Sequence, residues 1–537
     1  MIHTNKNTPT KKLNPIMFAG TGSDVGKSVI AAGFCRIFKQ DGYTPAPFKA
    51  QNMSLNSYAT PDGFEIGRAQ AVQAEAAGIP CSTDMNPLLL KPNSDHTSQV
   101  VLNGKPRGNS SAYDYFKKEG RQELRSEVNS AFDRLNAKYN PVVMEGAGSV
   151  SEINLREVDI VNMPMAIYAG ANVILVADIE RGGVFASVYG SIMLMTEEER
   201  ERVKGIMINK FRGDIRLFEQ GVKMIEQLCK VPVIGVLPYF KDIYIEAEDS
   251  LVLGRQNTGI LSQGKINIAV ILLRHLSNFT DFNVLEHDPR IHLFYTNHVD
   301  EIQKADIVII PGSKSTLDDL YELRRNGAAA AIMTARKNGA TILGICGGYQ
   351  MMGMEVCDPL HVEGDIEKLP GLGLLPTTTT MCGEKVTRQV QFRMAGGEKL
   401  QPENSAQQES GSGQQQESVG AQQQESDHAR QQFLCRGYEI HMGETTPYGN
   451  ATLSALNRLK DGGTEGTFAD HKCMGTYIHG ILDNSSFVNY LLEPYTGKPE
   501  QTEFDYAAFK EEQYDKLANH IRKHCNMEKV YEILTTK

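Results

Sequence analysis

The sequence predicts an α/β protein with two domains, each built from alternating strands and helices. Short apolar runs rich in Ile and Val recur along the chain with helical stretches between them. These runs are continuously hydrophobic, as expected for parallel strands buried on both faces. With 537 residues the chain is also too long for one ordinary core. A doubly wound sheet is therefore expected in the first half, followed by a second α/β series.

Strands and helices of the first domain follow from these runs. Helical patterns cover residues 65–77 and 120–139, between apolar segments. The predicted strands of the first domain are 16–19, 142–144, 173–177, 205–208 and 233–236.

The second series starts near Lys265, after a Gly-rich polar stretch at 249–264 that fits no strand or long helix. Its predicted strands are 266–273, 292–295, 307–310 and 341–345. A Gln-Ser-Glu-Gly segment at 403–432 cannot bury enough apolar surface to offset its ordering entropy, so it is expected to be a disordered insert. The predicted organisation is a flexible N-terminus at 1–14, domains at 15–255 and 256–500, and a surface helical tail at 501–537.

Composition narrows the class of protein. The hydrophobic content of 41% is that of a globular protein, and no run is long enough to span a bilayer. The polar start of the chain has no apolar signal segment, and the net charge of -10 argues against a nucleic-acid binder. The nine cysteines are scattered without a Cys-x-x-Cys pair, which predicts reduced thiols and gives no support for a zinc site. We expect a cytoplasmic protein with no membrane or nucleic-acid partner.

A phosphate-binding loop is predicted at 20–28, because Gly-Thr-Gly-Ser-Asp-Val-Gly-Lys-Ser follows a strand and opens a helical stretch. Backbone N–H groups and the helix N-terminus hold phosphate oxygens in such a loop. Lys27 supplies charge to the β- and γ-phosphates, and the Ser28 hydroxyl can bind Mg²⁺. The strict pattern would place its first glycine at Thr21, whereas here it lies one residue earlier. The predicted ATP contacts of the loop are Gly20, Thr21, Gly22, Asp24, Val25, Gly26, Lys27 and Ser28.

Polar residues after other strands are candidates for the same site, since ligands bind at the carboxyl ends of strands in open α/β sheets. Glu145 ends a strand and suits a second Mg²⁺ ligand, although a glutamate there is often only solvated. Lys49 could neutralise charge on a transferring phosphoryl group. Asn209, with Lys210 beside it, suits adenine recognition. A further loop adds an acid and an arginine on a Gly-Gly turn: Asp178, Arg181, Gly182 and Gly183.

A second centre is predicted around Cys346. Glycine lies on both sides of this cysteine, between an apolar strand and a helix, which permits the sharp turn that exposes a nucleophile. A buried core cysteine would not need those glycines. His479, far off in the sequence at a strand end, is the candidate general base. Backbone N–H groups of Gly312 and Gly347 are the candidate oxyanion hole.

These motifs resemble known families. The cysteine elbow with its distant histidine resembles class I glutamine amidotransferase domains, and the lengthened phosphate loop resembles that of dethiobiotin synthetase. Ordinary amidotransferases carry a Glu two residues after the histidine, whereas this chain has Ile481, a departure typical of the cobalamin-pathway branch. The group that orients His479 is thus unidentified. Five stretches further resemble the cobyric acid synthase family: 48–53, 65–70, 85–87, 178–187 and 209–214.

The resemblance implies amidation of the b, d, e and g carboxylates of adenosylcobyrinic acid a,c-diamide, with ATP, Mg²⁺ and glutamine as nitrogen donor. Cobalt would belong to the corrinoid substrate, and the oligomeric state stays open. One alternative is the sister enzyme cobyrinic acid a,c-diamide synthase, which lacks the stretch at 49–52. Another is a P-loop ATPase switch outside biosynthesis, which would leave Cys346 and His479 unexplained.

Overall fold

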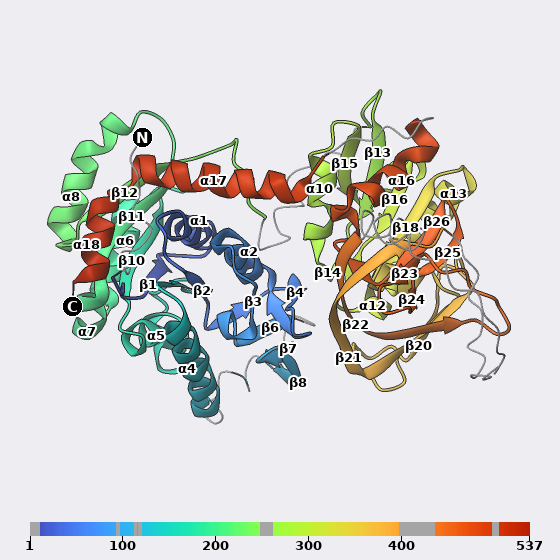
Figure 1. The fold of residues 1–537 in the computed structure, drawn as a ribbon, viewed down its shortest axis with the longest axis horizontal. Coiled ribbons are helices and arrows are strands. Elements are labelled where there is room, and N and C mark those ends of the chain that lie inside the picture. The colour runs from blue at the N-terminus through green and yellow to red at the C-terminus, as the bar shows by residue number, and fades with distance from the viewer. Residues whose placement is uncertain are drawn as a thin grey trace, which may run out of the picture. The chain divides into compact units, whose positions relative to one another are not determined.

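The structure, a computed structural model, describes residues 11–92, 97–111, 115, 121–246, 261–396, 435–496 and 504–536. The chain divides into two units, Met1–Asp249 with Ala507–Lys537, and Ser250–Tyr506 (Figure 1). This division lies close to the boundary expected near residue 255. The insert expected at 403–432 and most of the flexible N-terminus expected at 1–14 fall outside the described residues.

A six-stranded sheet forms the centre of the first unit, and all its strands run parallel. Every strand expected in this half is present, and the predicted doubly wound class is confirmed. In spatial order the strands are β12 (Val233–Pro238), β11 (Val203–Phe211), β10 (Asn172–Asp178), β1 (Ile16–Gly20), β9 (Val142–Glu145) and β2 (Ala46–Phe48).

Two hydrophobic cores cover the two faces of this sheet. Successive side chains of a strand point to opposite faces, so Ile16 and Phe18 enter one core while Met17 and Ala19 enter the other. The first core is closed by α1 (Lys27–Gln40), α17 (Tyr506–His524) and α18 (Met527–Thr535). The second is closed by α4 (Arg121–Lys138), α5 (Met163–Tyr168), α6 (Val184–Leu194) and α8 (Glu219–Cys229), and α7 (Glu197–Arg202) precedes β11.

The helix expected at 65–77 starts later than predicted. Its first residues form β5 (Glu65–Gly67), which pairs with β4 (Ser57–Ala59), and α2 spans Arg68–Ala77. Gly67 has an extended backbone whose N–H donates to Asn86 Oδ1, and glycine suits this position because a Cβ there would lie 2.9 Å from Asn52 Nδ2. A small sheet that the sequence did not predict lies in the same region: β3 (Gln51–Met53), β6 (Leu88–Pro92), β7 (Thr97–Leu102) and β8 (Lys105–Ser111).

The two ends of the chain pack into the first unit. Leu517 and Ile521 of α17 are buried in the core that covers α1, so the C-terminal helices are part of that core and more than a surface tail. Leu13 is buried as well, and Asn14 N donates to the Leu534 carbonyl at 2.9 Å. The chain is therefore ordered from before residue 14, earlier than the expected end of the flexible segment.

The second unit contains two larger sheets. The first carries the predicted strands and is parallel except for its last strand: β15 (Ile291–Thr296), β13 (Ile266–Ile271), β16 (Ile307–Ile310), β18 (Thr341–Ile345), β26 (Cys473–Thr476) and β25 (Thr467–Asp470). Its helices are α10 (Asn283–Glu286), α11 (Val299–Lys304), α12 (Thr316–Arg325), α13 (Ala328–Lys337), α14 (Gly347–Met352) and α16 (Ser485–Thr496).

A mainly antiparallel sheet, which the sequence did not predict, completes this unit. Its longest strands, β21 (Thr377–Met394) and β22 (Cys435–Pro447), pair along much of their length. The remaining strands are β19 (Glu355–Cys357), β20 (Lys368–Pro370), β23 (Asn457–Leu459), β24 (Thr464–Glu465) and β27 (Ile478–His479), with the two-residue pair β14 (Leu276–Ser277) and β17 (Gly312–Ser313) nearby. Within the described residues, no helix is long and apolar enough to cross a bilayer.

Candidate active sites

The predicted phosphate loop joins the end of β1 to the start of α1. Gly26 caps the helix with a φ of 98°, and a Cβ there would lie 2.3 Å from Asn209 Nδ2. Lys27 Nζ donates to the carbonyls of Gly22 and Gly148, each at 2.9 Å, so the lysine folds back over the loop. A Cβ at Gly20 would lie 2.8 Å from Lys27 Nζ. The early glycine of the loop is thus required by the lysine that crosses it.

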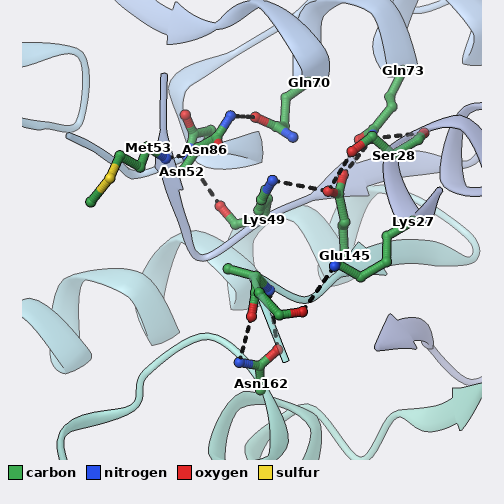
Figure 2. A network of polar contacts seen from close by, with 12 residues as sticks. Lys27, Ser28, Lys49, Asn52, Met53, Gln70, Gln73, Asn86, Glu145 and Asn162 are labelled. Atoms are coloured by element: carbon green, nitrogen blue, oxygen red, sulfur yellow. Dashed lines mark hydrogen bonds and ion pairs between the residues drawn. The ribbon is translucent and has the colours of Figure 1, made fainter. Parts of the chain in front are cut away.

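A buried polar cluster surrounds Glu145 at the end of β9 (Figure 2). Glu145 Oε1 accepts from Ser28 Oγ at 2.8 Å and from Lys49 Nζ at 2.9 Å. Gln73 of α2 donates to the second carboxylate oxygen at 2.7 Å. Lys49 and Glu145 are 5% and 1% exposed, and pairing keeps such a buried charge from standing alone. The predicted Mg²⁺ ligands Ser28 and Glu145 therefore lie in direct contact, with two hard oxygen atoms side by side.

Three of the family-like stretches meet behind this cluster (Figure 2). Asn86 Nδ2 donates to the Lys49 carbonyl at 3.1 Å, and Asn52 Nδ2 donates to Gln70 Oε1 at 3.1 Å. Asn52, Gln70 and Asn86 are each at most 2% exposed. This buried network fixes the turn that carries Lys49, which accounts for the polar residues at those positions.

The loop after β10 reaches the phosphate loop through its charged residues. Arg181 pairs with Asp24 at 3.3 Å, and Lys210 pairs with Asp178 at 3.0 Å. Lys210 Nζ also donates to the Asp24 carbonyl, and Asn209 Nδ2 donates to the Val25 carbonyl at 2.9 Å. Gly182 and Gly183, which follow Arg181 in this loop, have positive φ values of 77° and 71°. Glycine adopts this backbone conformation without the strain that a side chain would cause. The structure thus brings Asp178, Arg181 and Asn209 to the phosphate loop.

In the second unit, Cys346 lies at the sharp turn between β18 and α14. Its φ of 52° and ψ of -111° are strained for a residue with a side chain, at a cost of about 1–3 kcal/mol. Cys346 N donates to the Thr476 carbonyl at 2.8 Å, which anchors the turn to β26. Its Sγ contacts the Ile440 carbonyl at 3.5 Å. This is the predicted elbow geometry.

Glycines make the close approaches at this elbow possible. A Cβ at Gly348 would lie 1.9 Å from the Ile310 carbonyl oxygen, and one at Gly347 would lie 2.8 Å from Ser313 N. A Cβ at Gly312 would lie 3.3 Å from His479 Cε1. The two candidate oxyanion glycines are therefore brought to the same elbow, beside the candidate base.

His479 of β27 is held by a carboxylate that sequence reasoning did not identify. Its Nδ1 donates to Asp281 Oδ2 at 2.7 Å, and the other carboxylate oxygen accepts from Gly480 N at 3.0 Å. Asp281 lies in the turn Phe279–Phe282 and is 4% exposed. Burial lowers the pKa of His479, but the Asp281 carboxylate and the Cys346 sulfur raise it by a larger amount. The resulting pKa is about 10. The His479 ring is thus protonated, between the Asp281 carboxylate and the Cys346 sulfur.

Comparison with known proteins agrees with this two-centre arrangement. A CobQ/CobB/MinD/ParA nucleotide binding domain matches residues 16–252, and a CobB/CobQ-like glutamine amidotransferase domain matches residues 267–487. A cobyric acid synthase of Bacteroides fragilis is 67% identical, with 98% of this chain and 99% of the relative covered. Those of Phocaeicola vulgatus and Syntrophobacter fumaroxidans are 64% and 45% identical, with 98% and 97% of this chain and 99% of each relative covered.

The chain belongs to the cobyric acid synthase family. Membership confirms the predicted enzyme class, a glutamine-dependent amide ligase of cobalamin biosynthesis with a P-loop nucleotide-binding domain.

Two residues that contact the predicted site residues, Asp281 and Gln73, were not predicted from the sequence. Asp281 is 198 positions from His479, and no spacing rule connects a carboxylate to a histidine at that distance. Gln73 lies on α2 in a stretch that gives only a helical pattern. No local pattern marks Asp281 either, since the predicted strand 266–273 ends eight residues before it and only tertiary folding brings it to His479.

Proposed function

We propose that this protein amidates the b, d, e and g side-chain carboxylates of adenosylcobyrinic acid a,c-diamide to give adenosylcobyric acid, in adenosylcobalamin (vitamin B12) biosynthesis. The names of its relatives support the product, and the two clusters described above support the chemistry. In this proposal residues 15–255 form the synthetase domain and 256–500 the amidotransferase domain. The reaction runs in the cytoplasm on a small corrinoid, with no membrane or nucleic-acid partner.

Ammonia is released in the amidotransferase domain. Cys346 Sγ attacks the side-chain amide carbon of glutamine, and N–H groups at Gly312 and Gly347 stabilise the oxyanion that forms. His479 then gives its proton to the departing ammonia, leaving a thioester that water hydrolyses to glutamate. Asp281 holds the imidazole ring in the orientation that this proton transfer needs. The contact between His479 and Asp281 is the observation that carries this half of the proposal.

The carboxylate is activated in the synthetase domain, because a carboxylate is a poor electrophile at neutral pH. Transfer of the γ-phosphoryl group of ATP gives an acyl phosphate, and ammonia displaces phosphate to leave the amide. Lys27 lies where it can reach the β- and γ-phosphates after leaving its two carbonyl partners. Lys49, paired with Glu145, supplies charge next to the transferring group.

The residues present fit Mg²⁺. Ser28 Oγ and a Glu145 carboxylate oxygen lie 2.8 Å apart, and both are the hard oxygen donors that Mg²⁺ prefers when it also binds phosphates. Bound there, the ion would neutralise charge on the phosphates. Asp178, Arg181, Gly182 and Gly183 form the loop that would close on the transferring phosphoryl group. The cobalt remains within the corrinoid substrate.

The decisive experiment supplies purified protein with ATP, Mg²⁺, glutamine and each of two corrinoids, cobyrinic acid and adenosylcobyrinic acid a,c-diamide. Mass spectrometry of the products counts the amides added. We expect four new amides on adenosylcobyrinic acid a,c-diamide and none at the a and c positions of cobyrinic acid. Two amides on cobyrinic acid would instead identify a cobyrinic acid a,c-diamide synthase and overturn the proposed substrate.

A further inference from the structure

A cavity of about 130 Å³ opens beside the start of α1, next to the phosphate loop. Its lining includes Gly26 and Asn209 and, from α17, Leu517, His520 and Ile521. We propose that this cavity holds the purine base of the nucleotide and that the C-terminal helix α17 forms one of its walls, with His520 against the base. This inference rests on the proposed use of ATP.

The position of the cavity suits a base whose phosphates lie on the loop. Gly26 lines the cavity and caps α1 directly before Lys27 and Ser28, so the cavity adjoins the end of the loop where phosphates would bind. Apart from Lys210, which pairs with Asp178, the rest of the lining is apolar or aromatic, a surface that suits a flat heterocycle. Val29, Ile30, Leu237, Pro238, Tyr239 and Phe240 supply this surface.

Asn209 gives the cavity a preference among bases. Its Nδ2 donates to the Val25 carbonyl at 2.9 Å, which leaves the amide oxygen as the acceptor it can offer a ligand. Adenine carries an exocyclic amine that can donate to such an oxygen, whereas guanine carries a carbonyl at the equivalent position. The geometry therefore favours adenine.

The wall formed by α17 is held firmly against α1. A Cβ at Gly33 of α1 would lie 2.3 Å from Ile521 Cδ1, so the two helices meet at the closest approach that a glycine allows. Arg36 Nε pairs with Asp515 at 2.6 Å on the same pair of helices. Leu517 and Ile521 are buried, at 1% and 0% exposed. The sequence expectation of a surface tail missed this role.

The ring of His520 lies at the cavity wall, where it can stack against a purine base. Its Nε2 contacts the Pro238 carbonyl at 3.0 Å, and its ring lies 5.4 Å from that of Phe240 in an edge-on arrangement. Burial lowers the pKa of His520, so the ring is neutral at pH 7 and adds no charge beside a purine. Two anchors thus fix the ring at the cavity wall.

Titration calorimetry on the full chain tests this wall, with ATP, ADP and inorganic tripolyphosphate as separate ligands in the presence of Mg²⁺. Loss of one stacking contact should weaken binding of a base about tenfold. We expect His520→Ala to raise the Kd for ATP and for ADP about tenfold and to leave the Kd for tripolyphosphate unchanged. Gly33→Ala, which pushes α17 away, should give the same pattern.

Two further variants separate a base contact from a general disturbance. His520→Phe keeps an aromatic face and should bind ATP within about threefold of the wild type. Asn519→Ala changes the exposed neighbour on α17 and should bind all three ligands normally. Glutamine hydrolysis, a property of the other unit, should be unaltered in every variant.

Unchanged ATP affinity in His520→Ala would overturn the inference. So would an equal loss of ATP and tripolyphosphate binding, because that result would mean that the phosphate loop itself had moved. A wild-type protein that binds tripolyphosphate but neither ATP nor ADP would instead contradict the proposed function, and the two failures are therefore distinguishable.

Discussion

The carboxylate of Asp281 lies 2.7 Å from Nδ1 of His479, although 198 positions separate the two residues. In ordinary class I amidotransferases a Glu two residues after the histidine has this task, whereas here Ile481 occupies that position and is fully buried. Asp281 also accepts from Gly480 N, so the carboxylate is fixed by two bonds and cannot turn away. The dyad therefore has an orienting group that reaches it from a different segment of the chain.

Asp281→Asn should cripple glutamine hydrolysis while the fold is kept. An amide can donate to Nδ1 and so favour the wrong tautomer of His479, and in the Ser-His-Asp triad of serine proteases this change costs about 10⁴ in kcat. We expect kcat/KM for glutamine to fall by roughly 10²–10⁴-fold. ATP-dependent amidation with ammonium salts, measured in the same preparation, should be normal. Near-wild-type glutamine hydrolysis would show that Asp281 does not position His479.

The same variant should alter the pH dependence of glutamine hydrolysis. Asp281 and Cys346 raise the pKa of His479 to about 10, so the wild-type imidazolium persists up to that pH and is lost above it. Replacing Asp281 removes one of these causes, and the pKa of His479 must fall. We expect the basic limb of the kcat/KM profile, measured between pH 6 and pH 10.5, to move to lower pH in Asp281→Asn. An unmoved basic limb would assign it to another group.

Substitutions in the glutamine-hydrolysing site and in the ATP site should abolish different activities. Cys346→Ala removes the nucleophile, so we expect no glutamine-supported amidation but normal amidation with ammonium salts. Lys27→Ala removes the charge at the β- and γ-phosphates and should abolish amidation with either nitrogen source. Counting amides by mass with both nitrogen sources measures this directly. Loss of ammonium-supported activity in Cys346→Ala would contradict the division of labour between the two centres.

Much of this arrangement could be predicted from the sequence, because its signals are local. The parallel strands are recognisable in the sequence as apolar runs. The turns at Lys27 and Cys346 are flanked by glycines that the close contacts there require. The antiparallel sheet of the second unit was missed, because β21 alternates exposed and buried residues and gives no apolar run. Asp281 was missed because tertiary folding alone brings it to His479.

The contact between Ser28 and Glu145 predicts how the enzyme depends on Mg²⁺. Glu145→Gln keeps the shape of the side chain but replaces one carboxylate oxygen by an amide, and it leaves Lys49 without its buried anionic partner. We expect the Mg²⁺ concentration for half-maximal amidation to rise at least tenfold, with glutamine hydrolysis unchanged. Titration of activity with Mg²⁺ at saturating ATP measures the shift. Gln73→Glu, which adds a carboxylate beside the other oxygen of Glu145, Oε2, is the matched comparison and should not reproduce a rise of that size.

The glycine after the elbow should be irreplaceable for steric reasons. A Cβ at Gly348 would lie 1.9 Å from the Ile310 carbonyl oxygen and 2.8 Å from that of Pro311, and because both are backbone atoms there is little room for relief. Overpacking of this kind costs about 1–3 kcal/mol or more. We expect Gly348→Ala to lower the melting temperature of the second unit and to reduce glutamine hydrolysis, because α14 and Cys346 must shift together. Gly383→Ala, where a Cβ meets nothing within 4 Å, should leave both properties unchanged. Equal behaviour of the two variants in thermal unfolding would mean that the elbow tolerates a side chain and that its glycines serve another purpose.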